Sequence, residues 1–260
     1  MSSEKVVVER REGGVSLLMF NNPERRNAID MEVREEMGRL LDELDNDRDT
    51  RVIVLTGKGE HFSAGGDVKD WKDFTVLEAR ERLKRIHVPL RKMLQMEKPF
   101  IAMVRGYAVG AGMNFTLACD IIFASEDARF SQSFVRMGLI PDAGGLCLLP
   151  VAVGLHRAKE LMFTGEMIPA ARAMELGMVN RVFPKEALEE ETLAFARKLA
   201  QGPPVALGMT KRILNTLFLD GLEKVLEYEA QAQPFLFQTL DHKEGKTAFL
   251  EKREPRFTGK

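Results

Sequence analysis

Two glycine-rich segments are the part of the sequence best suited to chemistry. The first runs from His61 to Asp67 and the second from Arg105 to Asn114, and in each a strand pattern leads through small residues to a predicted helix start. Small side chains let a ligand approach the backbone, where exposed N–H groups act as hydrogen-bond donors, and a helix beginning near Gly112 adds its positive end. One such turn is explained by tight packing alone, whereas two favour a paired oxyanion hole that holds negative charge on a carbonyl oxygen.

Other common chemistries find no support. Gly57-Lys58-Gly59 follows a strand, but Phe62 stands where a dinucleotide-binding loop has its third glycine. Neither a GxxxxGK[ST] phosphate loop nor a GxSxG serine elbow is present. The histidines lack metal-ligand spacing, so we expect no metal and no separate cofactor. They are His61, His87, His156 and His242.

The elements that position these segments alternate between strands and helices up to about residue 185. Val6–Glu9 and Val15–Phe20 flank Gly13-Gly14 and predict a hairpin, and Asp30 is expected to cap a helix with apolar residues at helical spacing. Further strands are expected at Val52–Thr56, Phe100–Val104 and Ile121–Ala124, loops at Asp45–Thr50 and Gly106–Gly112, and helices at Thr75–Gln95, Met113–Cys119, Ala187–Leu199, Val205–Phe218, Leu222–Phe237 and Lys243–Arg253. This order predicts an α/β core followed by a helical region.

Composition limits the class of partner. The chain of 260 residues is 45% apolar and 30% charged, as expected for one globular protein. Lys+Arg and Asp+Glu nearly cancel, 38 against 39, which disfavours binding to nucleic acid or to a membrane surface. The polar opening Ser2–Lys5 is unlike a signal peptide, and the uncharged run within Phe100–Ser125 is too short to span a bilayer. Two cysteines, Cys119 and Cys147, make no disulfide framework, so we expect a cytoplasmic protein.

Six segments together carry a family pattern. They are Asn21–Ala28, Ser63–Asp67, Gly106–Gly112, Ile140–Gly145, Leu161–Gly165 and Phe249–Arg253. Over nearly the whole chain they resemble the enoyl-CoA hydratase/isomerase, or crotonase, family. The resemblance implies an α/β crotonase (ClpP-like) spiral of ββα units over residues 1–190, which carries the acyl-CoA site, and a helical C-terminal region over 191–260. That region builds homotrimers, often paired into homohexamers.

By the same resemblance, the backbone N–H groups of Gly66 and Ala111 form an oxyanion hole around the thioester oxygen of an acyl-CoA substrate. Relatives commonly have glycine at 111, and alanine matters there only if the position needs positive φ. One such donor contributes ~3–4 kcal/mol in the transition state. Further residues are implied to bind the CoA part of the substrate, and two of them, Phe249 and Lys252, reach across from a neighbouring subunit. They are Arg26, Ala28, Ala64, Gly65, Asp67, Lys69, Phe134, Phe249 and Lys252. For each Lys or Arg, an exposed solvated charge is the simpler interpretation.

The expected acid/base groups of a hydratase are missing. Hydratases of this family use two glutamates, and the matching positions here hold Asn114 and Phe134, neither of which exchanges a proton at neutral pH. The remaining carboxylate is Asp142, which from the residues alone is best interpreted as a helix N-cap after a proline. However, Phe130–Asp142 is similar to phenylacetate-pathway ring-1,2-epoxyphenylacetyl-CoA isomerases, in which this aspartate is the acid/base, as it is in related enoyl-CoA isomerases.

The resemblance therefore implies an isomerase. The oxyanion hole acidifies a carbon next to, or conjugated with, the thioester, and Asp142 moves its proton to another carbon, which shifts a double bond or opens a ring. Apolar neighbours such as Phe134 and Leu139 are expected to desolvate the carboxylate and raise its pKa.

Three alternatives remain open. In 4-chlorobenzoyl-CoA dehalogenase-like members, the aspartate is a nucleophile. Those enzymes also have a histidine twelve residues before the proline that opens the next strand, as His87 lies before Pro99 here. They carry tryptophan in place of Phe134. We expect His87 to be a partly exposed residue on a charged helix, which places this hydrolase second. A catalytically silent acyl-CoA binder would keep Gly66 and Ala111, and an enoyl-CoA hydratase is a further alternative. RNA binding, found in some relatives, is disfavoured by the neutral charge.

Overall fold

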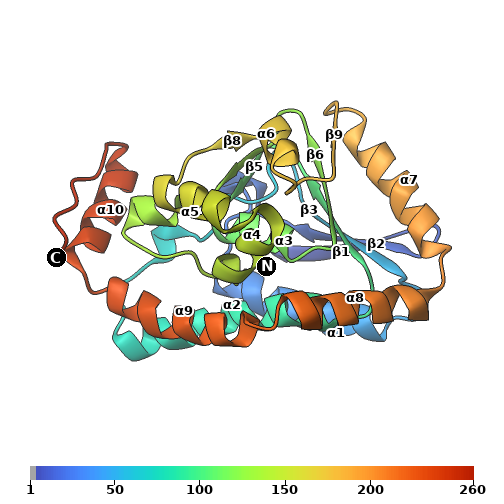
Figure 1. The fold of residues 1–260 in the computed structure, drawn as a ribbon, viewed down its shortest axis with the longest axis horizontal. Coiled ribbons are helices and arrows are strands. Elements are labelled where there is room, and N and C mark those ends of the chain that lie inside the picture. The colour runs from blue at the N-terminus through green and yellow to red at the C-terminus, as the bar shows by residue number, and fades with distance from the viewer. Residues whose placement is uncertain (1–3) are drawn as a thin grey trace.

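The computed structural model describes residues 4–260, apart from the side chain of Asp70; residues 1–3 of the polar opening lie outside this range. A six-stranded sheet in the order β1-β2-β3-β4-β6-β9 and a three-stranded sheet in the order β5-β7-β8 form the β part of the molecule (Figure 1). The strands are β1 (Val6–Arg11), β2 (Val15–Phe20), β3 (Val52–Gly57), β4 (Phe100–Val104), β5 (Tyr107–Val109), β6 (Ile121–Ser125), β7 (Arg129–Ser131), β8 (Ile168–Pro169) and β9 (Arg181–Phe183).

Helices cover both faces of the larger sheet and form the C-terminal part of the chain (Figure 1). The helices are α1 (Met31–Asn46), α2 (Val76–Gln95), α3 (Ala111–Leu117), α4 (Gly145–Val153), α5 (Leu155–Thr164), α6 (Ala170–Glu175), α7 (Leu188–Ala200), α8 (Pro204–Phe218), α9 (Leu222–Leu236) and α10 (Leu240–Glu251), with 3-10 helices η1 (Pro23–Arg25), η2 (Val68–Asp70) and η3 (Ser133–Met137). These α and β elements and the helical C-terminal region confirm the predicted fold class.

The large sheet is buried on both faces, and successive side chains of a strand point to opposite faces. In β3, Val52 and Val54 pack with α7, whereas Ile53 and Leu55 join the main core with α1 and α2. The predicted hairpin is confirmed, since β1 and β2 pair antiparallel with Val6 opposite Phe20. From β2 onward the neighbouring strands are parallel, so each connection crosses over through other elements, often a helix.

The first helix begins as predicted and ends later. The Asp30 side chain accepts a hydrogen bond from the Val33 N–H at 2.9 Å and caps α1. The loop expected to begin at Asp45 instead begins after Asn46, because the helical bonds continue until the Asp47 N–H donates to Glu43. This boundary was wrong by two residues.

The segment expected as one glycine-rich turn contains a strand. Gly106 and Gly110 both have φ of +54° and bracket β5, which pairs in parallel with β7. Consequently α3 begins at Ala111 and not at Met113. The strands β7 and β8 were not predicted, because strands of two or three residues leave no alternation to recognise.

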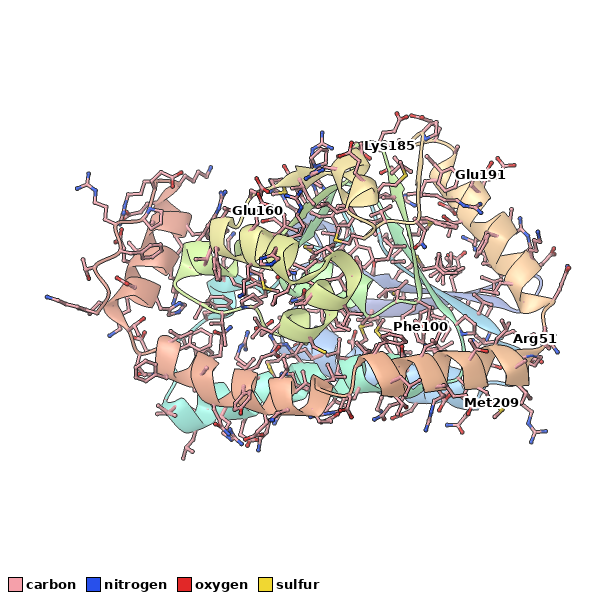
Figure 2. The ribbon with its side chains drawn as sticks, in the orientation of Figure 1. Arg51, Phe100, Glu160, Lys185, Glu191 and Met209 are labelled. Atoms are coloured by element: carbon pink, nitrogen blue, oxygen red, sulfur yellow. The ribbon has the colours of Figure 1, made fainter. Side chains whose placement is uncertain are left out.

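Two C-terminal helices lie along α2. Both α8 and α9 contact it, and they run together along one side of the molecule (Figure 1). Figure 2 shows Phe100 close to α8 and Met209 on the outer side of that helix. Lys211 of α8 places its Nζ 4.7 Å from the centre of the Phe100 ring and 3.0 Å from an Asp120 carboxylate oxygen, which anchors α8 to the sheet. Within residues 4–260, no helix has both the length and the apolar character that crossing a membrane requires.

Candidate active site

Hydrogen bonds join the two glycine-rich segments. The Ser63 N–H donates to the Tyr107 carbonyl at 2.8 Å, and the Val109 N–H donates to the Ser63 carbonyl at 3.0 Å. The first segment therefore runs beside β5, with Ser63 bridged to Ala108. The structure thus brings together the two segments that the sequence singled out.

The backbone at this contact leaves no room for larger side chains. Gly65 has φ of +88°, and a Cβ at that position would lie 2.6 Å from the Val109 carbonyl oxygen and 3.6 Å from the Ala111 nitrogen. Ala111 is not among the residues with positive φ, so alanine is compatible with its backbone. Within the described chain, neither the Gly66 nor the Ala111 N–H donates a hydrogen bond, so both are available to a ligand. Their role in an oxyanion hole stays a prediction.

An apolar cluster stands next to Gly66. A Cβ added to Gly66 would lie 3.3 Å from the Trp71 ring, and this ring packs edge to face with Phe237 at 5.5 Å between centroids. Phe134 and Leu139 belong to the same cluster and are buried. Sequence analysis missed Trp71, although a single tryptophan four residues after a predicted ligand-binding glycine segment was the signal available.

Several residues predicted to bind CoA lie near the first segment. The Arg26 carbonyl accepts a hydrogen bond from the Ala64 N–H at 2.9 Å, and the Arg26 guanidinium lies 5.7 Å from the centre of the Tyr107 ring. Ala28 is buried, and Lys69 is exposed. Asp67 accepts hydrogen bonds from the Lys69 N–H and from Arg25, so its carboxylate caps η2.

Phe249 and Lys252 lie on the surface of the chain. Phe249 is exposed on α10, and Lys252 is the exposed residue that follows this helix. Their predicted reach into the site of a neighbouring subunit stays a prediction.

Asp142 is not the helix cap that the residues alone suggested. Gly144 is the N-cap of α4, and the Gly145 N–H donates to the backbone carbonyl of Asp142. The Oδ1 atom of Asp142 is buried and has no hydrogen-bond partner within the described chain. An unpartnered carboxylate oxygen is costly to bury, so this atom is free to meet a ligand and not committed to the fold.

Burial, and to a smaller extent the nearby Glu229 carboxyl, raise the pKa of Asp142 to about 6. Arg34, His87 and Gln233 act in the opposite direction. The direction of the change in pKa is the one expected from apolar surroundings. A pKa near 6 leaves the group ionised at neutral pH and still basic enough to accept a proton from carbon.

Asn114 positions the Asp142 loop. It is fully buried, donates from Nδ2 to the Asp142 carbonyl at 2.7 Å and accepts from Gln132 Nε2 at 2.6 Å. Gly145 is required beside it, because a Cβ there would lie 2.4 Å from the Asn114 Nδ2. With both ends of its amide engaged, Asn114 acts as a support for the loop.

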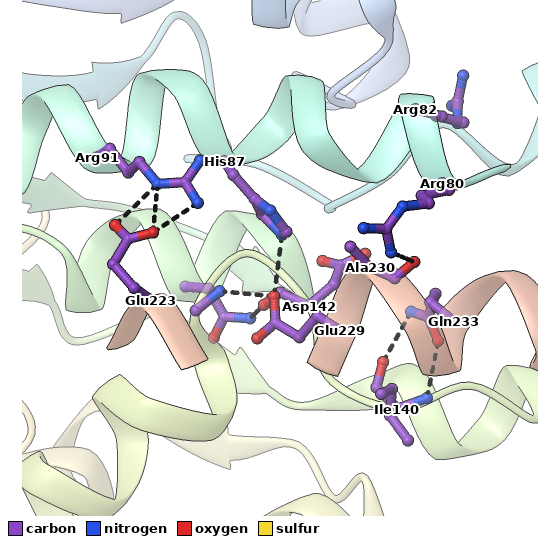
Figure 3. Close-up of polar contacts among 12 residues, drawn as sticks. Arg80, Arg82, His87, Arg91, Ile140, Asp142, Glu223, Glu229, Ala230 and Gln233 are labelled. Carbon is purple, nitrogen blue, oxygen red and sulfur yellow. Dashed lines mark hydrogen bonds and ion pairs between the residues drawn. The ribbon is translucent and has the colours of Figure 1, made fainter. Parts of the chain in front are cut away.

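His87 is not partly exposed, so that expectation was wrong. Only 1% of its surface is accessible, because α9 packs on α2 and covers it. Its Nε2 lies 3.2 Å from Glu229 Oε2, which also accepts from the Gly144 N–H at 3.2 Å (Figure 3). Burial lowers the pKa of His87 to about 4 and raises that of Glu229 to about 8, so both are neutral at pH 7.

Glu229 is the functional candidate that sequence analysis missed. The apolar stripe of α9 contains Leu222 and Leu226, and the next positions at helical spacing are Glu229 and Gln233, both buried. Polar residues in a buried stripe were the available signal, since a helix face that packs inward normally carries apolar side chains. In the described part of the chain, no group of three His, Cys, Asp or Glu side chains is arranged to hold a metal ion.

Known proteins resemble this chain along its whole length. The family model for enoyl-CoA hydratase/isomerase matches residues 10–260. A 1,2-epoxyphenylacetyl-CoA isomerase of Escherichia coli is 36% identical, with 98% of each chain covered. A short-chain-enoyl-CoA hydratase of Clostridium acetobutylicum is 34% identical over 98% of this chain and 97% of its own. The crystal structure of an enoyl-CoA hydratase from Mycobacterium avium subsp. paratuberculosis superimposes with a TM-score of 0.90 at 31% identity, with 98% of each chain covered.

Proposed function

This chain belongs to the enoyl-CoA hydratase/isomerase family, and on that basis we propose that it is an acyl-CoA isomerase with Asp142 as its acid/base. The observation that carries the proposal is the buried Oδ1 of Asp142, which has no partner within the described chain. Its pKa of about 6 suits a base at neutral pH. The acyl-CoA is the substrate, and the proposal includes no separate cofactor.

The proposed reaction transfers one proton within the substrate. Asp142 removes a proton from a carbon next to, or conjugated with, the thioester, and the electron pair of the C–H bond moves to the thioester oxygen. The N–H groups of Gly66 and Ala111 stabilise the resulting oxyanion. Asp142 then returns the proton to a different carbon, so a double bond moves or a strained ring opens without any change in mass.

Two other positions support isomerisation over hydration. Addition of water needs two acid/base groups, and the positions where hydratases of the family carry them hold Asn114 and Phe134 here. Asn114 is also committed to the Asp142 loop through both ends of its amide. The relatives carry both kinds of name, hydratase and isomerase, so the choice between them rests on these residues.

A substrate panel tests the proposal. The purified protein is mixed with 2-enoyl-, 3-enoyl- and aryl-CoA thioesters, followed by ultraviolet absorbance and mass spectrometry. Absorbance from new conjugation at constant mass supports the isomerase, and a gain of one water refutes it. Asp142→Asn should lower turnover by about 10²–10⁴-fold, as expected for loss of a general base, while acyl-CoA affinity is retained. A silent binder has no turnover to lose.

A second candidate function is hydrolysis through an aspartyl ester. The buried position of His87 near Asp142 favours it, because a neutral imidazole can accept a proton from water. In this route Asp142 attacks a chloroaryl-CoA, chloride leaves, and water activated by His87 cleaves the ester. Chloride release would support this route, as would an aryl ester on Asp142 that accumulates in the His87→Gln variant and is detected by mass spectrometry. Phe134 counts against it, because this side chain lacks an N–H.

The C-terminal helices suit a homotrimer or homohexamer, which we propose as the assembly. Large apolar side chains are exposed along α8, among them Met209, Leu217 and Phe218. Phe249 on α10 is exposed as well and would reach the CoA of a neighbouring subunit. Light scattering after size-exclusion chromatography tests this, and a monomer at micromolar concentration would contradict it.

A further inference from the structure

Glu229 is a second carboxyl group in the buried space around Asp142, and the proposed reaction does not use it. It lies on α9, and none of its surface is accessible. Its Oε1 has no hydrogen-bond partner within the described chain, as is also true of Asp142 Oδ1. Figure 3 shows Glu229 and Asp142 close together below His87.

Three elements surround the Glu229 carboxyl. From α2, His87 places Nε2 3.2 Å from Oε2. From the loop before α4, the Gly144 N–H donates to the same oxygen at 3.2 Å, and the Asp142 carboxyl lies near enough to interact electrostatically. From α4, Cys147 lies near enough to Glu229 to interact electrostatically, and burial raises the pKa of its thiol, so it adds no charge.

The charged groups beyond this ring are already committed. Arg91 of α2 pairs with Glu223 of α9 through three hydrogen bonds of 2.8–3.0 Å. Arg34 of α1 is buried, donates to the Arg82 carbonyl at 2.8 Å and acts electrostatically on Asp142. In the described part of the chain, Arg34 is the cation that acts most strongly on Asp142.

Resting on the proposed role of Asp142, we propose that Asp142 and Glu229 form a coupled pair that carries a single negative charge. Glu229 keeps its proton and donates it to His87 Nε2, while the Gly144 N–H occupies the other side of the same oxygen. Asp142 is then the ionised member of the pair. Glu229 is thus a positioning residue, which acts on the reaction through Asp142 and His87.

The energetic reason is that an ionised Glu229 would have the Gly144 N–H as a donor to one oxygen and no donor to the other. Two like charges in a poorly solvated site cannot both ionise easily, so one pKa rises strongly. The unpartnered Oε1 of Glu229 would be a buried charged oxygen without a donor, whereas a protonated group loses far less on burial. A neutral His87, with a pKa near 4, is the acceptor that the Glu229 proton needs.

This pairing predicts two limbs in the pH dependence of kcat/KM. Below about pH 6 Asp142 is protonated and cannot act as a base. Above about pH 8 Glu229 ionises, and its charge opposes the negative charge that develops on the substrate. The rate should therefore rise and then fall, with apparent pKa values that belong to the pair.

The test combines kinetics with a measurement that needs no substrate. Glu229→Gln keeps an uncharged side chain of the same shape, and Glu227→Gln, on the exposed side of the same helix, is the matched control. Glu229→Gln should lose the alkaline limb of the profile and keep the acid limb. Glu227→Gln should keep both limbs. A Glu229→Gln profile that retains the alkaline limb overturns the proposal.

Infrared difference spectroscopy between pH 6.5 and 9.5 reports protonated carboxyl groups directly. The protein should show one such band that disappears with a midpoint near 8 and is missing from Glu229→Gln. Because coupling is reciprocal, Asp142→Asn should lower that midpoint. Absence of the band, or an unchanged midpoint in Asp142→Asn, overturns the pair even if Glu229→Gln fails to fold. If Asp142→Asn retains full turnover, the proposed function fails, while the spectra still decide the pair.

Discussion

Asp142→Asn should increase the stability of the fold at the pH where it removes activity. Burial raises the pKa of Asp142 from an ordinary value of 3.8 to about 6, so the folded protein binds this proton more tightly than the unfolded chain does. The cost of ionising the group in the fold is therefore absent below about pH 4, develops between about 4 and 6, and is constant above 6. The rise in pKa corresponds to about 3 kcal/mol, and some of this is lost if the asparagine amide finds no acceptor.

The assay is urea unfolding of both proteins at a series of pH values. Asp142→Asn should match the parent near pH 4 and exceed its free energy of unfolding by about 2–3 kcal/mol at pH 8. Asp45→Asn, at an exposed position of α1, is the control and should show no such pH-dependent gain. If Asp142→Asn is less stable than the parent at pH 8, or if its gain in stability does not depend on pH, the Asp142 carboxylate is well solvated and the reasoning fails.

Three further outcomes are expected. Gly65→Ala places a Cβ 2.6 Å from the Val109 carbonyl at a backbone with positive φ, so it should cost about 1–3 kcal/mol in chemical denaturation and lower kcat/KM by more than about tenfold, and native stability would refute the required contact. Lys211→Met removes a buried ammonium that lies 3.0 Å from the partly exposed Asp120 carboxylate and donates to the Met93 and Lys98 carbonyls, so it should lower the free energy of unfolding by about 1–3 kcal/mol, whereas a neutral result would show that these contacts do not anchor α8. Since Asp142 must be ionised to act as a base, kcat/KM for an isomerised enoyl-CoA should rise as pH passes through about 6, and a flat profile between pH 5 and 7 would exclude it.

The parts of the fold with long periodic patterns could be predicted from the sequence. The helix capped by Asp30 and the strand Phe100–Val104 were found because each has a clear period or a cap. The strand Tyr107–Val109 was not, because three residues between two glycines are indistinguishable from a turn. Its pairing partner lies more than twenty residues further along the chain, and local patterns carry no information about such pairing.

The part of the candidate site that is formed by backbone N–H groups could be predicted from the sequence, and the part formed by side chains between α2 and α9 could not. The glycine segments around Gly66 and Ala111 were recognised from residue types alone, since small residues are needed for close approach. His87 was misjudged because its burial depends on α9, which lies far away in sequence and carries the Glu229 that covers it. Asp142 looked like a cap because a proline precedes it, and the cap moved to Gly144.

The contact between α9 and α2 has a consequence for how the protein matures. A ribosome synthesises the N-terminal residue first, so His87 and Asp142 exist long before Glu229 emerges. Until the last helices dock, the histidine remains open to water and titrates like any surface imidazole. A chain that stops short of α9 would therefore have neither a covered His87 nor the second carboxyl, so the environment of Asp142 is completed only when the last helices dock.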